Sequence, residues 1–128
     1  MGNTVLVVDD DPIMRELLRI HLANAGYTVA MASDGVEAGY AVLRSRPDLI
    51  IADVNMPYLD GFALVEAMRG EPALQDVPVI FLTSHAQGHA RGRALGAVDY
   101  LEKPIRADRL LSLVAHHLAR VAAPEHSS

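Results

Sequence analysis

Cysteine and tryptophan are both absent from this chain of 128 residues. Without cysteine there are no disulfide bonds, thiolate metal sites or cysteine nucleophiles, and a reducing compartment is allowed. Long apolar runs are also missing, because no stretch approaches the roughly 20 residues that cross a bilayer. Met1, Gly2 and Asn3 lead into the first apolar run without the pattern of a signal peptide. We therefore expect a cytoplasmic protein with no membrane partner.

Positive charge is scarce as well. The 11 basic residues are outnumbered by 16 acidic ones, which gives a net charge of -5 and argues against the broad basic surface that nucleic-acid binding needs. The remaining composition, 51% hydrophobic and 21% charged, is that of an ordinary globular protein. The length fits one domain with its own core. We expect a single domain over residues 1–121, with residues 122–128 as a flexible tail or the start of a linker, and no direct nucleic-acid partner.

Short apolar runs alternate with stretches of helical periodicity along the chain. The runs are rich in β-branched residues and predict five strands, over residues 5–8, 27–32, 49–52, 79–82 and 98–101. Helices are predicted around residues 13–25, 35–44, 61–69, 86–95 and 110–121. This alternation predicts parallel strands with right-handed crossovers. The expected fold class is α/β, a flavodoxin-like doubly wound sheet of five parallel strands in the order 2-1-3-4-5 with five helices on both faces.

Apolar stripes on the predicted helices are expected to face this sheet. The first helix carries Met14, Leu18, Leu22 and Ala25 beside Ile13, Leu17 and Ile20, and the second carries Val36, Tyr40 and Leu43. The fourth helix is expected to be short, because Gly88 and Gly92 weaken it. His116 and His117 lie near the end of the last helix, where the helix dipole favours a positive charge, and we expect no further role for them.

Polar residues follow four of the five predicted strands. Asp9 and Asp10 follow the first, Asp53 the third, Thr83 the fourth and Lys103 the fifth. The carboxyl ends of parallel strands lie at one edge of a sheet, where ligands bind in this kind of fold. The sequence therefore predicts that these five side chains form one site.

The carboxylates of this predicted site indicate a magnesium ion. A hard cation takes oxygen ligands, and Asp9, Asp10 and Asp53 supply them, with the backbone carbonyl of Asn55 as a further candidate. Asp11 stands before Pro12 and is interpreted instead as the N-cap of the first helix.

A carboxylate flanked by Mg²⁺, a hydroxyl group and an ammonium group is suited to accept a phosphoryl group. Asp53 is the predicted nucleophile. Thr83 is predicted to donate a hydrogen bond to the phosphoryl oxygen, and Lys103 to pair with it.

The motifs around these residues resemble the receiver domain of the two-component response-regulator family, in order and in spacing. They are Val7-Val8-Asp9-Asp10-Asp11-Pro12, Asp53-Val54-Asn55-Met56-Pro57 with Asp60-Gly61, Leu82-Thr83-Ser84, Gly96-Ala97 and Asp99-Tyr100-Leu101-Glu102-Lys103-Pro104. The resemblance extends over about residues 4–121. It implies a Mg²⁺-dependent phosphoacceptor module of a phosphorelay, not an enzyme, in which a sensor histidine kinase or a phosphotransfer protein phosphorylates Asp53.

The same resemblance implies a switch. Phosphorylation would draw Thr83 inward and reposition Tyr100, which alters the face formed by the fourth helix, the fifth strand and the fifth helix. That face would bind a downstream protein target or an output domain, and it would also serve for a homodimer. The resemblance further implies a cis peptide bond between Lys103 and Pro104. In the family that the chain resembles, the position of His85 influences how water reaches the phosphate, so the sequence does not predict the lifetime of the phosphate.

Other interpretations remain at this point. Arg91, Arg93, Arg106 and Arg109 fall on or beside the switching face, and we hypothesise that they bind an acidic partner. A Mg²⁺-dependent phosphohydrolase is the alternative function, with Asp9 as nucleophile and Asp11 as acid, although the sequence contains no insertion large enough for a substrate-binding cap. A receiver that no longer accepts phosphate is a third, weaker alternative.

Overall fold

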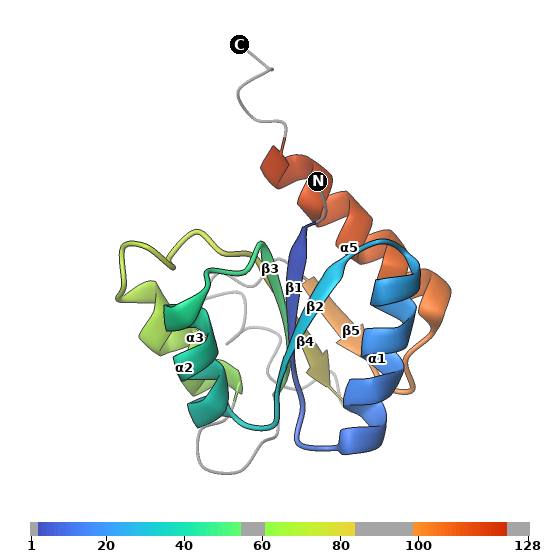
Figure 1. The fold of residues 1–128 in the computed structure, drawn as a ribbon, viewed down its shortest axis with the longest axis horizontal. Coiled ribbons are helices and arrows are strands. Elements are labelled where there is room, and N and C mark those ends of the chain that lie inside the picture. Colours follow the sequence, from blue (N-terminus) through green and yellow to red (C-terminus); the bar gives the residue numbers. More distant parts are fainter. Residues whose placement is uncertain (1–2, 55–60, 84–98, 123–128) are drawn as a thin grey trace.

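A five-stranded parallel sheet forms the centre of the molecule, in the strand order β2-β1-β3-β4-β5 (Figure 1). The computed structural model describes residues 3–54, 61–83 and 99–122. Its strands are β1 (Thr4–Val8), β2 (Thr28–Ala32), β3 (Leu49–Asp53), β4 (Val79–Thr83) and β5 (Asp99–Glu102). The predicted fold class and strand order are confirmed.

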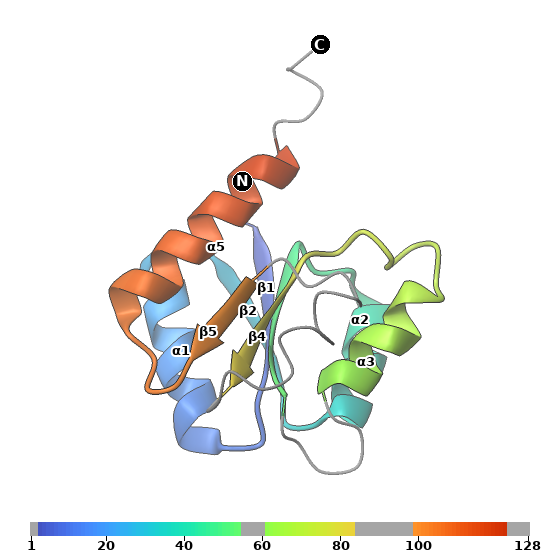
Figure 2. The same cartoon turned by 180° about the vertical axis from the view of Figure 1, so that it is seen from behind.

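Four helices within the described residues cover both faces of this sheet. They are α1 (Pro12–Asn24), α2 (Gly35–Arg44), α3 (Gly61–Arg69) and α5 (Ala107–Ala122). The helices α1 and α5 cover one face, and α2 and α3 the other (Figures 1 and 2). The predicted fourth helix, over residues 86–95, lies outside the described residues. None of the described helices has the length and apolar character needed to cross a membrane.

Side chains of the central strands alternate between two hydrophobic clusters, one on each face. Val5, Val7, Ile51 and Leu82 point towards α1 and α5, whereas Leu6, Val8, Ala52 and Phe81 point towards α2 and α3. The strands β3 and β4 are buried along their whole length, as expected for central strands of a sheet with both faces covered. This rigid sheet fixes the positions of the residues that follow its strands.

Two predicted helix stripes are partly wrong. On α1, Leu18 and Leu22 are buried as predicted, but the flanking residues Ile13, Leu17 and Ile20 are exposed. On α2, the predicted stripe of Val36, Tyr40 and Leu43 is exposed, and the small residues Gly35 and Ala38 together with Val42 face the core instead. Apolar periodicity alone therefore did not identify the buried face of α2.

Candidate functional site

Carboxylates from two neighbouring strands meet at the carboxyl edge of the sheet. Asp53 ends β3, and Asp9 follows Val8, the last residue of the adjacent strand β1. One oxygen from each of Asp9, Asp10 and Asp53 lies within 4.8 Å of the others. Asp9 and Asp53 are buried, whereas Asp10 is exposed. The predicted clustering of these three residues is confirmed.

The turn between β1 and α1 holds Asp9 in place through its backbone and one carboxylate oxygen. The backbone amide of Asp11 donates to Asp9 Oδ1 at 2.9 Å, and Arg15 Nη1 donates to the Asp9 carbonyl oxygen at 2.8 Å. Asp11 itself caps α1, because its side chain accepts a hydrogen bond from Ile13 N at 3.0 Å. The interpretation of Asp11 as an N-cap is confirmed. The contact of Arg15 was not predicted, and the sequence signal for it is only its place in the first turn of α1.

Asp9 carries a buried carboxylate whose negative charge is only partly compensated by its surroundings. Its Oδ2 atom is buried and has no hydrogen-bond partner among the described residues. Burial raises the pKa of Asp9 to about 6, and the charges of Asp53 and Asp10 add to the rise, although the Asp11 amide and Lys103 oppose it. A buried carboxylate without full compensation is unfavourable. A cation beside Asp9 Oδ2 would remove this cost.

Lys103 reaches the two buried carboxylates from the loop after β5. Its Nζ atom lies 3.0 Å from Asp53 Oδ2 and 3.7 Å from Asp9 Oδ2. Burial alone lowers the pKa of Lys103, but the hydrogen bond and charge of Asp53 and the charges of Asp9 and Asp10 raise it overall. The Lys103 amide donates to the Thr83 carbonyl at 2.9 Å, and the Lys103–Pro104 peptide bond is cis, as the resemblance implies.

The remaining predicted site residues are only partly described. Thr83 is 3% exposed and follows Leu82, the register partner of Asp53. Asn55 and His85, both named in the sequence analysis, lie outside the described residues. Tyr100 lies on β5, two positions before the end of that strand.

Gly61, the first residue of α3, approaches the site more closely than the sequence analysis anticipated. A Cβ atom at Gly61 would lie 2.5 Å from the Asp53 carbonyl oxygen and 3.2 Å from Cε1 of Phe81. Only glycine fits there without a shift of the Asp53 backbone. The Asp60-Gly61 motif thus allows α3 to begin directly against the end of β3.

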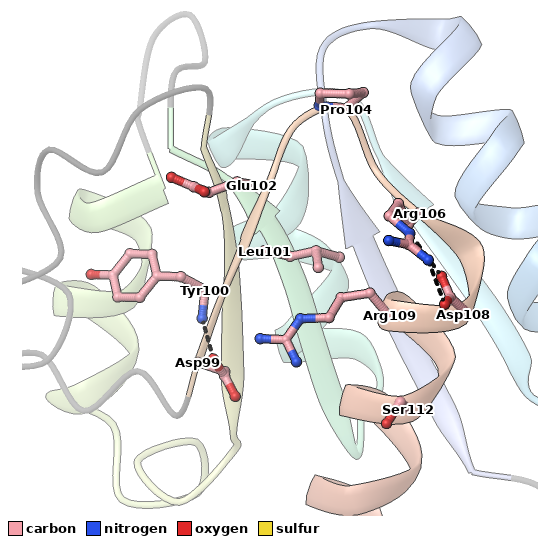
Figure 3. Close-up of a pocket in the computed structure, with 9 residues that line it drawn as sticks. All are labelled: Asp99, Tyr100, Leu101, Glu102, Pro104, Arg106, Asp108, Arg109 and Ser112. Atoms are coloured by element: carbon pink, nitrogen blue, oxygen red, sulfur yellow. Dashed lines mark hydrogen bonds and ion pairs between the residues drawn. The ribbon is translucent and has the colours of Figure 1, made fainter.

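A groove runs beside the site, between β5 and α5 (Figure 3). Tyr100 and Leu101 leave β5 on opposite sides, and Arg109 extends across the groove from α5. Arg106 pairs with Asp108 of α5 at 2.9 Å. The predicted role of the arginines in binding an acidic partner stays a prediction, since Arg91 and Arg93 lie outside the described residues.

A second contact between a carboxylate and a basic side chain lies at the opposite end of β5, where Asp99 is partly exposed. His117 of α5 is 5% exposed, and its Nε2 atom lies 3.2 Å from Asp99 Oδ2. The other oxygen of Asp99 accepts a hydrogen bond from the Tyr100 amide at 2.9 Å. The expectation of no role for His117 beyond the helix dipole is therefore wrong. Its position three residues after Val114 and seven after Leu110, both buried, was the signal that could have revealed it.

Comparisons with known proteins agree with this geometry. Residues 5–115 match the family described as response regulator receiver domain. Response regulator MprA from Mycobacterium tuberculosis is 40% identical over 130 residues, which covers 100% of this chain and 55% of MprA. The structure of a putative response regulator from Chloroflexus aurantiacus superposes with a TM-score of 0.89 at 36% identity, covering 94% of this chain and 100% of that one.

A third similar protein carries a metal ion. The receiver domain of sensor histidine kinase PA1611 from Pseudomonas aeruginosa has a magnesium ion coordinated in its active-site cleft; it superposes with a TM-score of 0.85 at 30% identity, covering 93% of this chain and 99% of that one. This chain spans about half the length of the curated relatives that it matches.

Proposed function

The chain belongs to the response regulator receiver domain family, and from that premise we propose that Asp53 is its phosphoacceptor. The observation that carries the proposal is the excess of buried negative charge at the carboxyl edge, where Asp9 and Asp53 share the single ammonium group of Lys103 among the described residues. Such a site favours the binding of a divalent cation and the transfer of a phosphoryl group to one of its carboxylates.

Asp53 is the carboxylate best placed for this reaction. Its Oδ2 atom contacts Lys103 at 3.0 Å, and an ammonium group at that distance offsets charge that develops on phosphoryl oxygens. The carboxylate attacks phosphorus and becomes an acyl phosphate, and the bond from phosphorus to the donor atom breaks. We propose that Thr83 donates a hydrogen bond to a phosphoryl oxygen, and that this contact draws Thr83 inward while Tyr100 changes position.

Magnesium fits the residues that are present. Three carboxylate oxygens lie together, and the buried Asp9 Oδ2 has no hydrogen-bond partner among the described residues. Asp9, Asp10 and Asp53 would hold the ion, with the Asn55 carbonyl as a fourth candidate ligand. When bound, the ion supplies positive charge that stabilises the transferred phosphoryl group. The structure of the related PA1611 receiver domain with its coordinated magnesium ion supports this assignment.

We propose a sensor histidine kinase or a phosphotransfer protein as the phosphoryl donor, and a downstream protein or output domain as the receiver of the signal through the face that includes β5 and α5. A homodimer through this face is a further proposal. We also propose that residues 1–121 form the receiver unit and that residues 122–128 continue as a tail or linker.

The phosphohydrolase alternative loses support from the same contacts. That enzyme needs Asp11 as a proton donor near the nucleophile Asp9, but the Asp11 side chain accepts the Ile13 amide as the cap of α1. We therefore retain the receiver function alone.

Intact-protein mass spectrometry tests the proposal. The purified chain is incubated with acetyl phosphate and Mg²⁺, and we expect one phosphoryl adduct that peptide mapping assigns to Asp53. Asp53→Asn should abolish the adduct, whereas Asp108→Asn, a carboxylate change on the exposed surface of α5, should leave it unchanged. Absence of an adduct on the wild type, or steady release of phosphate from phosphate esters that depends on Asp9, would refute the proposal.

A further inference from the structure

A row of side chains crosses the sheet directly beneath the carboxyl edge. Ala52, Phe81 and Tyr100 are register partners on β3, β4 and β5, and all three pack into the cluster on the α2 and α3 face. Phe81 is 0% exposed. Its ring centroid lies 5.8 Å from that of Tyr100, with an angle of 38° between the ring planes. The ring of Tyr100 thus packs against the buried ring of Phe81.

The same phenylalanine ring also contacts the start of α3. The ring of Phe62 lies edge-on to Phe81 with centroids 4.9 Å apart. A Cβ atom at Gly61 would lie 3.2 Å from Phe81 Cε1 and 2.5 Å from the Asp53 carbonyl. Phe81 therefore lies between the Asp53 backbone and Tyr100, and side-chain alternation places it on the same side of β4 as Thr83, two residues later.

We propose that Phe81 is a positioning residue for Tyr100, and that the contact between the two rings favours the arrangement in which Asp53 is paired with Lys103. The proposal rests on the proposed function, because it concerns the repositioning of Tyr100 that accompanies a phosphoryl group on Asp53. Removal of the phenyl ring releases Tyr100 and makes the phosphoryl-bound arrangement easier to reach.

Thermodynamic linkage predicts that the contact between Phe81 and Tyr100 changes the affinity for a ligand that prefers the phosphoryl-bound arrangement. A contact that stabilises one of two arrangements weakens every ligand that prefers the other. Beryllofluoride, a tetrahedral complex that binds a carboxylate as a phosphoryl group does, provides such a ligand without covalent chemistry. An aromatic pair of this kind is worth about two- to tenfold in an equilibrium constant, so that is the expected size of the effect.

The experiment compares the affinity of the wild type, Phe81→Leu and Phe81→Met for beryllofluoride at saturating Mg²⁺, by calorimetric titration. We expect both variants to bind about two- to tenfold more tightly than the wild type, with Mg²⁺ affinity changed less than about twofold. The methionine variant keeps most of the side-chain volume, so it provides the measurement if the leucine variant does not fold. Unchanged or weaker beryllofluoride binding by the folded variants would overturn the proposal.

A double-mutant cycle separates positioning from mere packing. In a Tyr100→Leu background, Phe81→Leu should no longer change the affinity, and a persistent gain would contradict the assignment. Ile80→Val truncates the other face of β4, which packs against the α1 and α5 cluster. This control should lower stability without altering beryllofluoride affinity, and a gain equal to that of Phe81→Leu would reduce the effect to loss of packing.

Failure of the proposed function gives a different result. If the wild type binds no beryllofluoride, or if Asp53→Asn binds it equally well, the phosphoacceptor assignment fails and this inference fails with it. If the wild type binds it through Asp53 and the Phe81 variants match the wild type, only the role of Phe81 is overturned.

Discussion

The two ends of β5 each carry a partly buried contact between a carboxylate and a basic side chain, but the number of carboxylates for each basic side chain differs. At the carboxyl end, Lys103 faces both Asp9 and Asp53; we call these three residues the acidic edge. At the amino end, His117 contacts the single carboxylate of Asp99 among the described residues; we call these two the histidine pair. The acidic edge holds more acids than bases, whereas the histidine pair matches one with one.

Hydrogen bonding of the carboxylate oxygens also differs between the two ends. Both oxygens of Asp99 have partners, because one faces His117 Nε2 and the other accepts the Tyr100 amide. At the acidic edge, Asp9 Oδ2 is buried without a hydrogen bond among the described residues. Each end thus keeps one buried atom without a hydrogen bond among the described residues, because His117 Nδ1 also lacks a partner. At the histidine pair the carboxylate itself is satisfied, whereas at the acidic edge the unsatisfied atom belongs to a carboxylate, whose charge a cation can compensate. A buried carboxylate that is only partly compensated, rather than a contact between a carboxylate and a basic side chain, distinguishes the functional end.

Removal of Lys103 should have the largest effect on this comparison. Lys103→Met leaves Asp9 and Asp53 as neighbouring buried carboxylates without their shared cation, and breaking such a pair is costly. Because the Lys103 side chain is 24% exposed, we expect a loss of about 2 to 3 kcal/mol in the free energy of unfolding without Mg²⁺, measured by urea denaturation. The double variant with Asp9→Asn should recover most of this loss, and failure to recover would show that Lys103 acts by packing instead.

Replacement of Asp9 should have the opposite sign. Asp9→Asn removes a buried charge that is only partly compensated, so without Mg²⁺ the variant should be more stable than the wild type by about 1 to 2 kcal/mol at pH 7. The same variant should bind Mg²⁺ at least about tenfold more weakly, because it loses a carboxylate ligand. Calorimetric titration with Mg²⁺ and urea denaturation with chelator measure the two effects. A destabilised variant would mean that Asp9 is fully compensated in the folded chain.

The stability gain from Asp9→Asn should depend on pH. Burial raises the pKa of Asp9 from 3.8 to about 6 in the folded chain, so between these values the folded state binds more protons at Asp9 than the unfolded state does. The unfavourable contribution of Asp9 is thus greatest above pH 6 and disappears as the pH falls towards 4. The difference in unfolding free energy between Asp9→Asn and the wild type should shrink over that range, and a constant difference would contradict this origin.

The acidic edge could be predicted from sequence because its residues follow strands directly. Once the order 2-1-3-4-5 is assumed, Asp9, Asp53 and Lys103 must reach one edge, and the described residues confirm that they do. The raised pKa of Asp9 could not be predicted, since it depends on complete burial and on which amides happen to reach the carboxylate. The contact of Arg15 with the Asp9 carbonyl has the same origin in the local turn.

The histidine pair was missed for a different reason. The contact between Asp99 and His117 connects the start of β5 to the second half of α5. No sequence motif fixes the distance between these two residues. Histidine on an apolar stripe is compatible with both a buried and an exposed place. On α2 the same uncertainty about helix rotation assigned Tyr40 and Leu43 to the core, although they are exposed. Sequence periodicity finds helices better than it orients them.

Asp99→Asn tests whether the contact between Asp99 and His117 stabilises the fold. The amide keeps an acceptor for the Tyr100 amide but weakens the contact with His117, so we expect a loss of about 1 kcal/mol in unfolding free energy. Mg²⁺ affinity and phosphorylation by acetyl phosphate should stay at the wild-type level, because the pair lies at the far end of β5 from the acidic edge. The same substitution would thus stabilise the chain at Asp9 and destabilise it at Asp99. Weaker Mg²⁺ binding by Asp99→Asn would show that the two ends are coupled.

Asp108→Asn should have the smallest effect and sets the baseline for the comparison. Asp108 pairs with Arg106 at 2.9 Å, but the two side chains are 71% and 77% exposed, so solvent already satisfies both charges. The hydrogen bond to the Arg109 amide and the contact with Arg106 lower the pKa of Asp108, yet an exposed charge loses little when it becomes an amide. The melting temperature and Mg²⁺ affinity should match the wild type within error. A clear shift in either would mean that charge alone, without burial, accounts for the effects predicted at Asp9 and Asp99.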